Sequence, residues 1–245
     1  MWGRVTFRLI LATAASSLAL AGGAQAATLT LGSQFQGYTG DAFDFSASGG
    51  TIAQTALPSP LIAISPVDGT VTQWRFSGAG PSFTPVVIRP QGTGRYAVSV
   101  GGAAQPAAPG YVITGPFPLS LPIHRGDLFG YSAPLGSGGV IIRTGTGHIF
   151  YEPPLGTSPE VPDATVANTY ELAMNATVRY CVVPALKKKT PKAARAALAA
   201  ADCTVGKTKK SKKRRKKKQV LSQSLPPRSQ VSDTAPVDIK VSRKR

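Results

Sequence analysis

Hydrophobic and polar residues alternate in short runs through residues 27–180, and Gly, Pro and Ser separate one run from the next. An alternation with a period of two is typical of β-strands that bury one face. The runs that we expect to form strands are 70–76, 84–89, 95–100, 127–131, 140–143, 148–151 and 173–180. They predict a mainly β body, an antiparallel β-sandwich of the jelly-roll kind, with a barrel as the alternative.

Residues 181–245 show a different pattern, which predicts a small α+β unit. Thr190 is suited to cap a helix and Pro191 to occupy its first position. Apolar residues then recur on one face of a helix of about eleven residues: Ala194, Ala197, Leu198 and Ala201. Short strands are expected at 204–209, 219–224 and 237–241, so one helix would pack on three strands.

The charge divides the chain at the same place. Residues 27–180 contain six Arg and eight Asp or Glu, a net charge of −2, whereas residues 181–245 contain twenty Lys or Arg and three Asp, a net charge of +17. A strongly basic segment joined to a nearly neutral body predicts an anionic partner for the basic segment. The sign alone does not choose between nucleic acid, anionic lipid and an anionic wall polymer.

The first 26 residues predict export. A basic start, a short apolar stretch and the cleavage signal Ala24-Gln25-Ala26 form the pattern of a secretory signal peptide. We therefore expect a secreted protein, extracellular or associated with the cell wall, with no transmembrane segment in the mature chain. The two cysteines agree with this, because an even number in an exported chain indicates a disulfide between Cys181 and Cys203.

Two parts of the sequence resemble known proteins. The strings SPVDGTVTQWRFSG and LPIHRGDLFGY in the body resemble β-sandwich domains of exported proteins of actinobacterial type, which implies a fold more than an activity. The strings VVPALKKKTPKAARAALAAADCTVG, QVLSQSLPPRSQV and PVDIKVS resemble the PASTA domain of penicillin-binding proteins and bacterial Ser/Thr kinases.

The PASTA resemblance covers residues 181 to about 243. Its most specific matches are the strand at 220–224 with Pro226, the entry at Pro184 and the helix start at Thr190. The family usually has Gly at three positions that differ here: Lys188, Arg228 and about Asp233. The resemblance implies recognition of peptidoglycan fragments or a spacer role at the cell wall, without catalysis, and it assigns no ligand residue.

The stretch KTKKSKKRRKKK at residues 207–218 is the densest cluster of charge. It falls between two expected strands, so we predict that it forms the tip and upper arms of a hairpin inside the module of residues 181–245. Its ten cations are the predicted polyanion-binding residues: Lys207, Lys209, Lys210, Lys212, Lys213, Arg214, Arg215, Lys216, Lys217 and Lys218. The alternative is a solvated loop with no dedicated partner.

The expected export of the protein and the composition of residues 181–245 together indicate which class of polymer could bind. Residues 181–245 contain no Phe, Tyr or Trp, so the aromatic platform of single-stranded nucleic-acid binders is absent and no specific nucleic acid is expected. Regularly spaced anionic groups on a polymer remain a good match, because each neutralised group releases counterions. For an exported chain we expect peptidoglycan or an anionic cell-wall polymer.

Catalysis is not expected. The body lacks a G-x-S-x-G nucleophile motif, and the chain has only two histidines, His124 and His148, neither near the cysteines. We predict no catalytic residue, cofactor or metal.

Two alternatives stay open: a carbohydrate-binding or adhesive protein whose specificity lies in the sandwich, and an extracellular hydrolase that uses His124, His148 or Asp127. The aromatic residues that form either a sugar platform or the core are Trp74, Phe76, Tyr96, Tyr111, Phe129, Tyr131 and Phe150.

Overall fold

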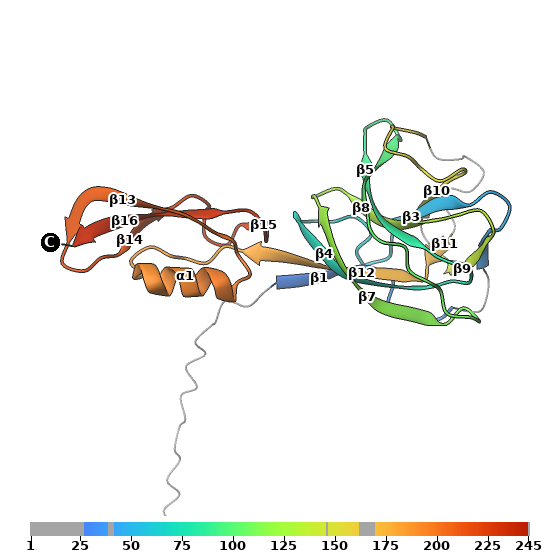
Figure 1. Cartoon of the computed structure of the whole chain (residues 1–245), viewed down its shortest axis with the longest axis horizontal. Helices are drawn as coiled ribbons and strands as arrows, with labels where there is room; N and C mark the ends of the chain where they lie inside the picture. Colours follow the sequence, from blue (N-terminus) through green and yellow to red (C-terminus); the bar gives the residue numbers. More distant parts are fainter. Residues whose placement is uncertain (1–26, 39–41, 146, 162–169, 245) are drawn as a thin grey trace, which may run out of the picture.

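The computed structural model describes residues 27–38, 42–145, 147–161 and 170–244. It consists of two lobes joined end to end (Figure 1), a larger body and a smaller module that contains the helix α1 (Pro191–Ala200). The signal peptide predicted for residues 1–26 lies outside the described residues. In the described ranges, no helix is both long and apolar enough to cross a membrane.

The body is built from open antiparallel sheets, which confirms the mainly β, sandwich-like fold. The first sheet has the order β1 (Ala27–Gly32), β12 (Met174–Val182), β4 (Gly69–Ser77), β7 (Ile113–Ile123). The second has the order β10 (Gly147–Tyr151), β3 (Gly50–Ala56), β8 (Leu128–Ala133), β5 (Thr84–Pro90), β6 (Tyr96–Gly101). A small third sheet has the order β11 (Tyr170–Leu172), β9 (Ser137–Thr144), β2 (Ala42–Phe45).

Aromatic side chains fill the space between the two large sheets. Trp74 and Phe76 of β4 stack with their ring centroids 4.6 Å apart, and Phe129 of β8 meets Trp74 edge-on at 6.0 Å. Most of the aromatic residues that the sequence offers for a sugar platform are therefore buried in the core: Trp74, Phe76, Phe129, Tyr131 and Phe150. Tyr96 and Tyr111 are half-buried.

The long strand β7 is absent from the strands expected from the sequence. Pro116, Pro118 and Pro122 interrupt its alternation. Proline has no N–H to donate to a ladder and is tolerated on an edge strand, which β7 is, because only β4 pairs with it in its sheet. A pattern-based prediction reads such a stretch as a loop.

The module packs α1 against a three-stranded sheet in the order β13 (Val205–Arg215), β16 (Val237–Lys244), β14 (Val220–Gln223). The helix begins where the sequence predicts, because the side chain of Thr190 accepts a hydrogen bond from the N–H of Ala193 at 3.2 Å and Pro191 occupies the first turn. Its buried residues, Ala194 and Leu198, belong to a module core that is separate from the core of the body.

The predicted hairpin at 207–218 is wrong. Residues up to Arg215 belong to the strand β13, which pairs in parallel with the C-terminal strand β16, with shifts of register between Val205 and Thr208 and between Lys210 and Arg214. On its other side β16 pairs antiparallel with β14. The last strand thus lies between the two strands that were expected to pair, and this arrangement depends on a contact distant in sequence that local alternation does not encode.

The two lobes share a strand. β12 crosses from the body into the module through Tyr180 and Cys181, where the boundary between them was predicted. Beyond the end of β4, the short strand β15 (Gln230–Ser232) pairs with Val182, Cys181 and Tyr180 of β12. The first sheet of the body therefore continues into the module.

Candidate polyanion-binding surface

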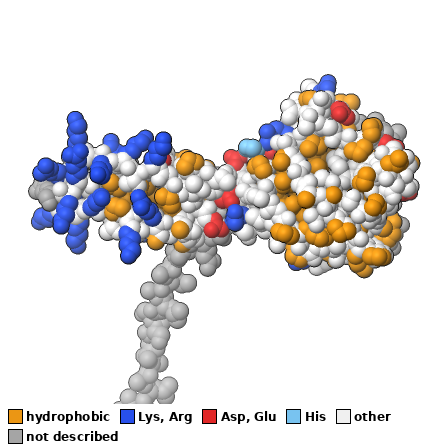
Figure 2. All heavy atoms as spheres, viewed as in Figure 1, with side chains coloured by type: hydrophobic (Ala, Val, Ile, Leu, Met, Phe, Trp, Pro, Cys, Tyr) orange, Lys and Arg blue, Asp and Glu red, His pale blue; other side chains and the backbone are white. Residues whose placement is uncertain are grey.

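The basic residues of the module gather at the end that points away from the body, as the blue side chains in Figure 2 show. All ten predicted cations of residues 207–218 are exposed. We name this region the basic end and define it by the distal part of β13, the turn that follows it and the last residues of β16. A hollow of about 500 Å³ lies there, lined by Arg214, Arg215, Lys216, Lys217 and Gln219.

Strand register adds cations that the linear run does not contain. In the parallel ladder, Arg214 lies opposite Arg243 and Arg215 opposite Lys244. Nearer the body, Lys209 lies opposite Lys240. Like charges directly opposite each other on neighbouring strands destabilise the pairing, so an anion bound between them would relieve the repulsion.

A further group of lysines reaches the sheet from the segment before the helix. The backbone N–H of Lys188 donates to the carbonyl of Val220 at 3.0 Å, and the N–H of Val220 donates to the carbonyl of Lys189 at 2.9 Å. These bonds place residues 187–189 beside the start of β14, just after the turn of the basic end. The sequence does not assign six further cations to this surface: Lys187, Lys188, Lys189, Lys240, Arg243 and Lys244. The one signal for them in the sequence is that half of the module's cations lie outside 207–218.

Ser242 fixes the turn of the basic end. Its side chain is buried, and its hydroxyl accepts a hydrogen bond from the N–H of Gln219 at 3.0 Å. Its own backbone N–H donates to the carbonyl of Gln219 at 2.9 Å. These two hydrogen bonds fix Gln219 to β16. The turn that carries Lys216 to Lys218 is therefore held in place beside the end of β16.

The three acidic residues of the module lie away from the basic end. Asp238 accepts a hydrogen bond from the backbone N–H of Lys207 and lies 3.8 Å from the ammonium group of Lys209. Asp202 and Asp233 both lie near Arg179 of β12 at the junction. In the described ranges, Lys209 is the one cation of the run with an acidic partner within 4 Å. The other cations of the run have no acidic side chain within 4 Å among the described residues, so they can contact an external anion.

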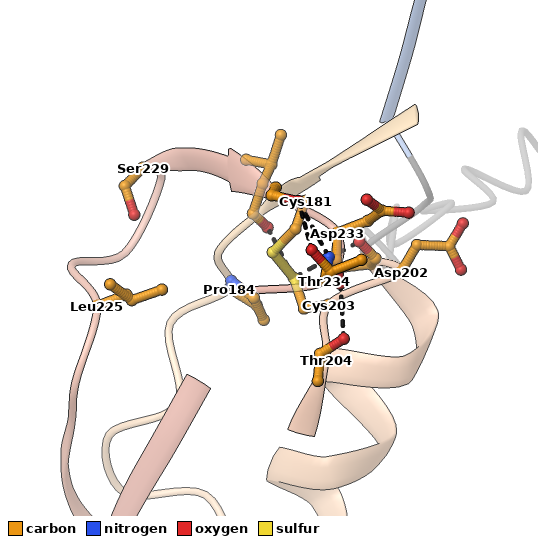
Figure 3. Close-up of a disulfide and its surroundings, with 12 residues drawn as sticks. Cys181, Pro184, Asp202, Cys203, Thr204, Leu225, Ser229, Asp233 and Thr234 are labelled. Atoms are coloured by element: carbon orange, nitrogen blue, oxygen red, sulfur yellow. Dashed lines mark hydrogen bonds between the residues drawn. A yellow bond between two sulfur atoms is a disulfide. The ribbon is translucent and has the colours of Figure 1, made fainter. Parts of the chain in front are cut away.

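The junction is held by a buried carboxylate. Asp233 accepts hydrogen bonds from the hydroxyl of Thr70 in the body at 2.7 Å and from Nε of Arg179 at 2.9 Å. The hydroxyl of Thr204 donates to the backbone carbonyl of Asp233 at 2.7 Å (Figure 3). These contacts fix β15 and the start of β13 to the body, so the basic end has a defined direction relative to it.

The predicted disulfide is present. Cys181 of β12 is bonded to Cys203, which follows α1, and both are buried in the module core (Figure 3). The bond joins the shared strand to the C-terminal end of the helix.

Two residues of the hydrolase alternative lie together and the third lies elsewhere: Nδ1 of His124 is 3.5 Å from Oδ2 of Asp127, and both contact Arg89. Asp127 is 2% exposed and accepts two hydrogen bonds from Arg89 and one from the backbone N–H of His124. The carboxylate thus holds the guanidinium group of Arg89 and the turn at His124. His148 lies elsewhere, between the rings of Phe43 and Tyr170 at 6.1 and 5.7 Å, and no described contact joins it to Asp127.

His148 predicts a loss of stability in acid. The residue is buried, and neither ring nitrogen has a hydrogen-bond partner among the described residues. Burial lowers the pKa of His148, and the nearby backbone of Tyr170 offsets this only in part. The unfolded chain then binds more protons than the folded chain below pH about 6.5, so stability falls as the pH drops from there toward the lowered pKa.

Urea unfolding, followed by the fluorescence of the buried Trp74 of the body, measures this dependence between about pH 7.5 and about pH 5.5, about one unit either side of the unfolded histidine pKa. We expect His148→Phe, which suits the aromatic neighbours, to reduce the acid sensitivity. His124→Gln is the matched control, because His124 is the only other histidine and it is exposed. Equal pH dependence in the wild type and His148→Phe would contradict the assignment.

Comparisons with models of protein families, with curated proteins and with solved structures found no match to this chain.

Proposed function

We propose that this chain is an exported, non-catalytic protein of the cell envelope, and that the basic end of its module attaches it to an anionic polymer. The observation that carries the proposal is the separation of charge within the module. Cations from β13, the following turn and β16 meet at one end, while the acidic residues lie toward the body. Such a surface attracts closely spaced anionic groups and releases their counterions.

The resemblance of residues 181–245 to the PASTA domain adds peptidoglycan to the proposal. A helix on a three-stranded sheet is compatible with that resemblance. Peptidoglycan carries carboxylates itself and anchors anionic wall polymers, so either component would suit the basic end. A solvated basic surface without a partner is the alternative, and it predicts no preference between anionic and neutral polymers.

The test is cosedimentation of the full chain with purified peptidoglycan sacculi. One preparation keeps its anionic polymers and another is stripped of them. The variant changes Arg214, Arg215 and Lys216 to Ser, and the matched control changes the exposed cations Lys192, Arg195 and Arg228 to Ser. Both variants lose the same net charge, but only the first loses cations of the basic end.

We expect strong binding to intact sacculi, and a loss of about tenfold or more in the first variant against a smaller loss in the control. Binding that survives stripping, high salt and the first variant would assign recognition to a PASTA-like face and reject the basic end. Failure of the wild type to bind intact sacculi would reject attachment altogether.

A further inference from the structure

The body carries two hollows on either side of one anchored segment, residues 33–38. The first has a volume of about 310 Å³ and three aromatic side chains in its wall, Phe35, Tyr38 and Tyr111. The second has a volume of about 510 Å³ and is lined largely by polar groups, among them Gln34, Gln36 and Asn175. Gln34 and Gln36 are exposed, and their side-chain amides make no hydrogen bond with a described residue.

The segment between the hollows is held firmly at several points. The N–H of Ser33 donates to the carbonyl of Met174 at 2.8 Å. The hydroxyl of Tyr38 lies within hydrogen-bond distance of two groups, the hydroxyl of Ser33 at 2.7 Å and the buried carboxylate of Glu171 at 3.2 Å. Arg143 pairs with Glu171, donates to the carbonyl of Gln36 and lies over the ring of Tyr38, 5.3 Å from its centroid. The aromatic and amide groups are therefore presented in fixed positions before any ligand arrives.

Two of the aromatic residues occupy a backbone conformation that side chains rarely adopt. Phe35 has φ 58° and Tyr111 has φ 57°, whereas the other described non-glycine residues with positive φ are polar. The N–H of Phe35 donates to the hydroxyl of Ser33 at 2.9 Å, and the hydroxyl of Ser77 donates to the carbonyl of Tyr111. Such conformations persist where the surroundings impose them, and they concentrate at binding sites. Here both bring a ring into the wall of the same hollow.

The lining excludes a charged ligand as the natural occupant. None of the described residues that line the two hollows carries a charge, and the nearby Arg143 is neutralised by Glu171. Aromatic rings on one side of the segment and unpaired amides on the other match an extended ligand with apolar ring faces and equatorial hydroxyl groups. A hollow of this size accommodates one or two sugar rings.

We propose that the segment 33–38 forms a binding site for a neutral oligosaccharide, whose rings stack on Phe35 and Tyr111 on one side of the segment and whose hydroxyl groups bond the amides of Gln34 and Gln36 on the other. The site is independent of the basic end, because it lies in the body and needs no charge.

The test titrates neutral hexasaccharides of glucose, of N-acetylglucosamine and of mannose into the full chain and follows binding by calorimetry. Tyr111→Gly and Phe35→Gly each remove a ring from the hollow and also relieve the positive φ, so we expect the fold to tolerate them. Thr93→Gly is the matched control, since Thr93 also has positive φ but lies in an exposed turn away from the hollows. Gln34→Ala and Gln36→Ala test the amides.

We expect saturable binding of at least one hexasaccharide, weakened about tenfold by Tyr111→Gly or Phe35→Gly and unchanged by Thr93→Gly. The Arg214, Arg215 and Lys216 to Ser variant should bind the sugar as the wild type does, which separates this site from attachment through the basic end. Absence of saturable binding by all three sugars, or binding that persists when Tyr111→Gly and Phe35→Gly are combined, would overturn the proposal.

Discussion

Raising the salt concentration from about 50 to about 200 mM is expected to weaken the binding of the full chain to a linear polyphosphate by about a thousandfold or more. The reason is that each cation that contacts a phosphate releases a condensed counterion, and the entropy gained by that release falls as bulk salt rises. The basic end presents more than enough exposed cations for six such contacts, the lower count for which this loss is typical. The measurement is fluorescence anisotropy of labelled polyphosphate across the salt series.

The structure sharpens this prediction beyond the linear run. Because Arg243 and Lys244 lie opposite Arg214 and Arg215, the double variant R243S/K244S should reduce the salt slope as much as R214S/R215S does, by about two. The control K192S/R195S removes equal charge from the helix and should change the slope less. If R243S/K244S behaves like the helix control, the cations of β16 do not take part and the surface is the linear run alone.

The second large effect is expected from the disulfide. Removing the bond between Cys181 and Cys203, 22 residues apart in sequence, should cost the module about 3 kcal/mol, because the unfolded chain regains the freedom of a closed loop. The module has a small core, so this is a large part of its stability. Two-state unfolding does not describe two joined lobes well, so local hydrogen exchange is the suitable measurement.

We expect amides of α1 and β16 to exchange about a hundredfold faster in C181A/C203A than in the wild type, and amides of β8 in the body to change little. The reductant dithiothreitol should reproduce the effect in the wild type and have none on the double variant. Exchange in the module that is the same with and without the bond would show that packing alone holds the helix to β12.

The contrast between α1 and the basic run shows which parts of this molecule its sequence predicts. The helix is specified by neighbours in the chain, namely the cap at Thr190, the proline that follows it and apolar residues at helical spacing. The place of the basic run depends on β16, which begins nineteen residues after Lys218 and inserts between β13 and β14. Alternation predicts that a strand exists, but it does not choose the partner of that strand.

In the candidate sites, too, some features are evident from the sequence and others depend on contacts between distant residues. The ten cations of 207–218 are evident from composition, whereas Arg243 and Lys244 become part of the same surface only through strand register. In the body, the aromatic residues were visible in the sequence, but burial separates Trp74 and Tyr131 in the core from Tyr111 at the surface. The positive φ of Tyr111 had no sequence signal, because glycine is the residue that usually marks such a position.

The shared strand β12 has a mechanical consequence for the attachment through the basic end that we propose. A pull along the long axis, applied at the basic end and resisted by the body, reaches the body along β12, whose antiparallel neighbours β1 and β4 lie on its two sides. A load parallel to paired strands stretches many backbone hydrogen bonds together, whereas a load across them would open one bond at a time. Where β12 enters the module, Arg179 donates a hydrogen bond to Asp233, and Cys181 forms the disulfide with Cys203. For the attachment that we propose, the junction between the body and the module is therefore suited to carry tension rather than to bend.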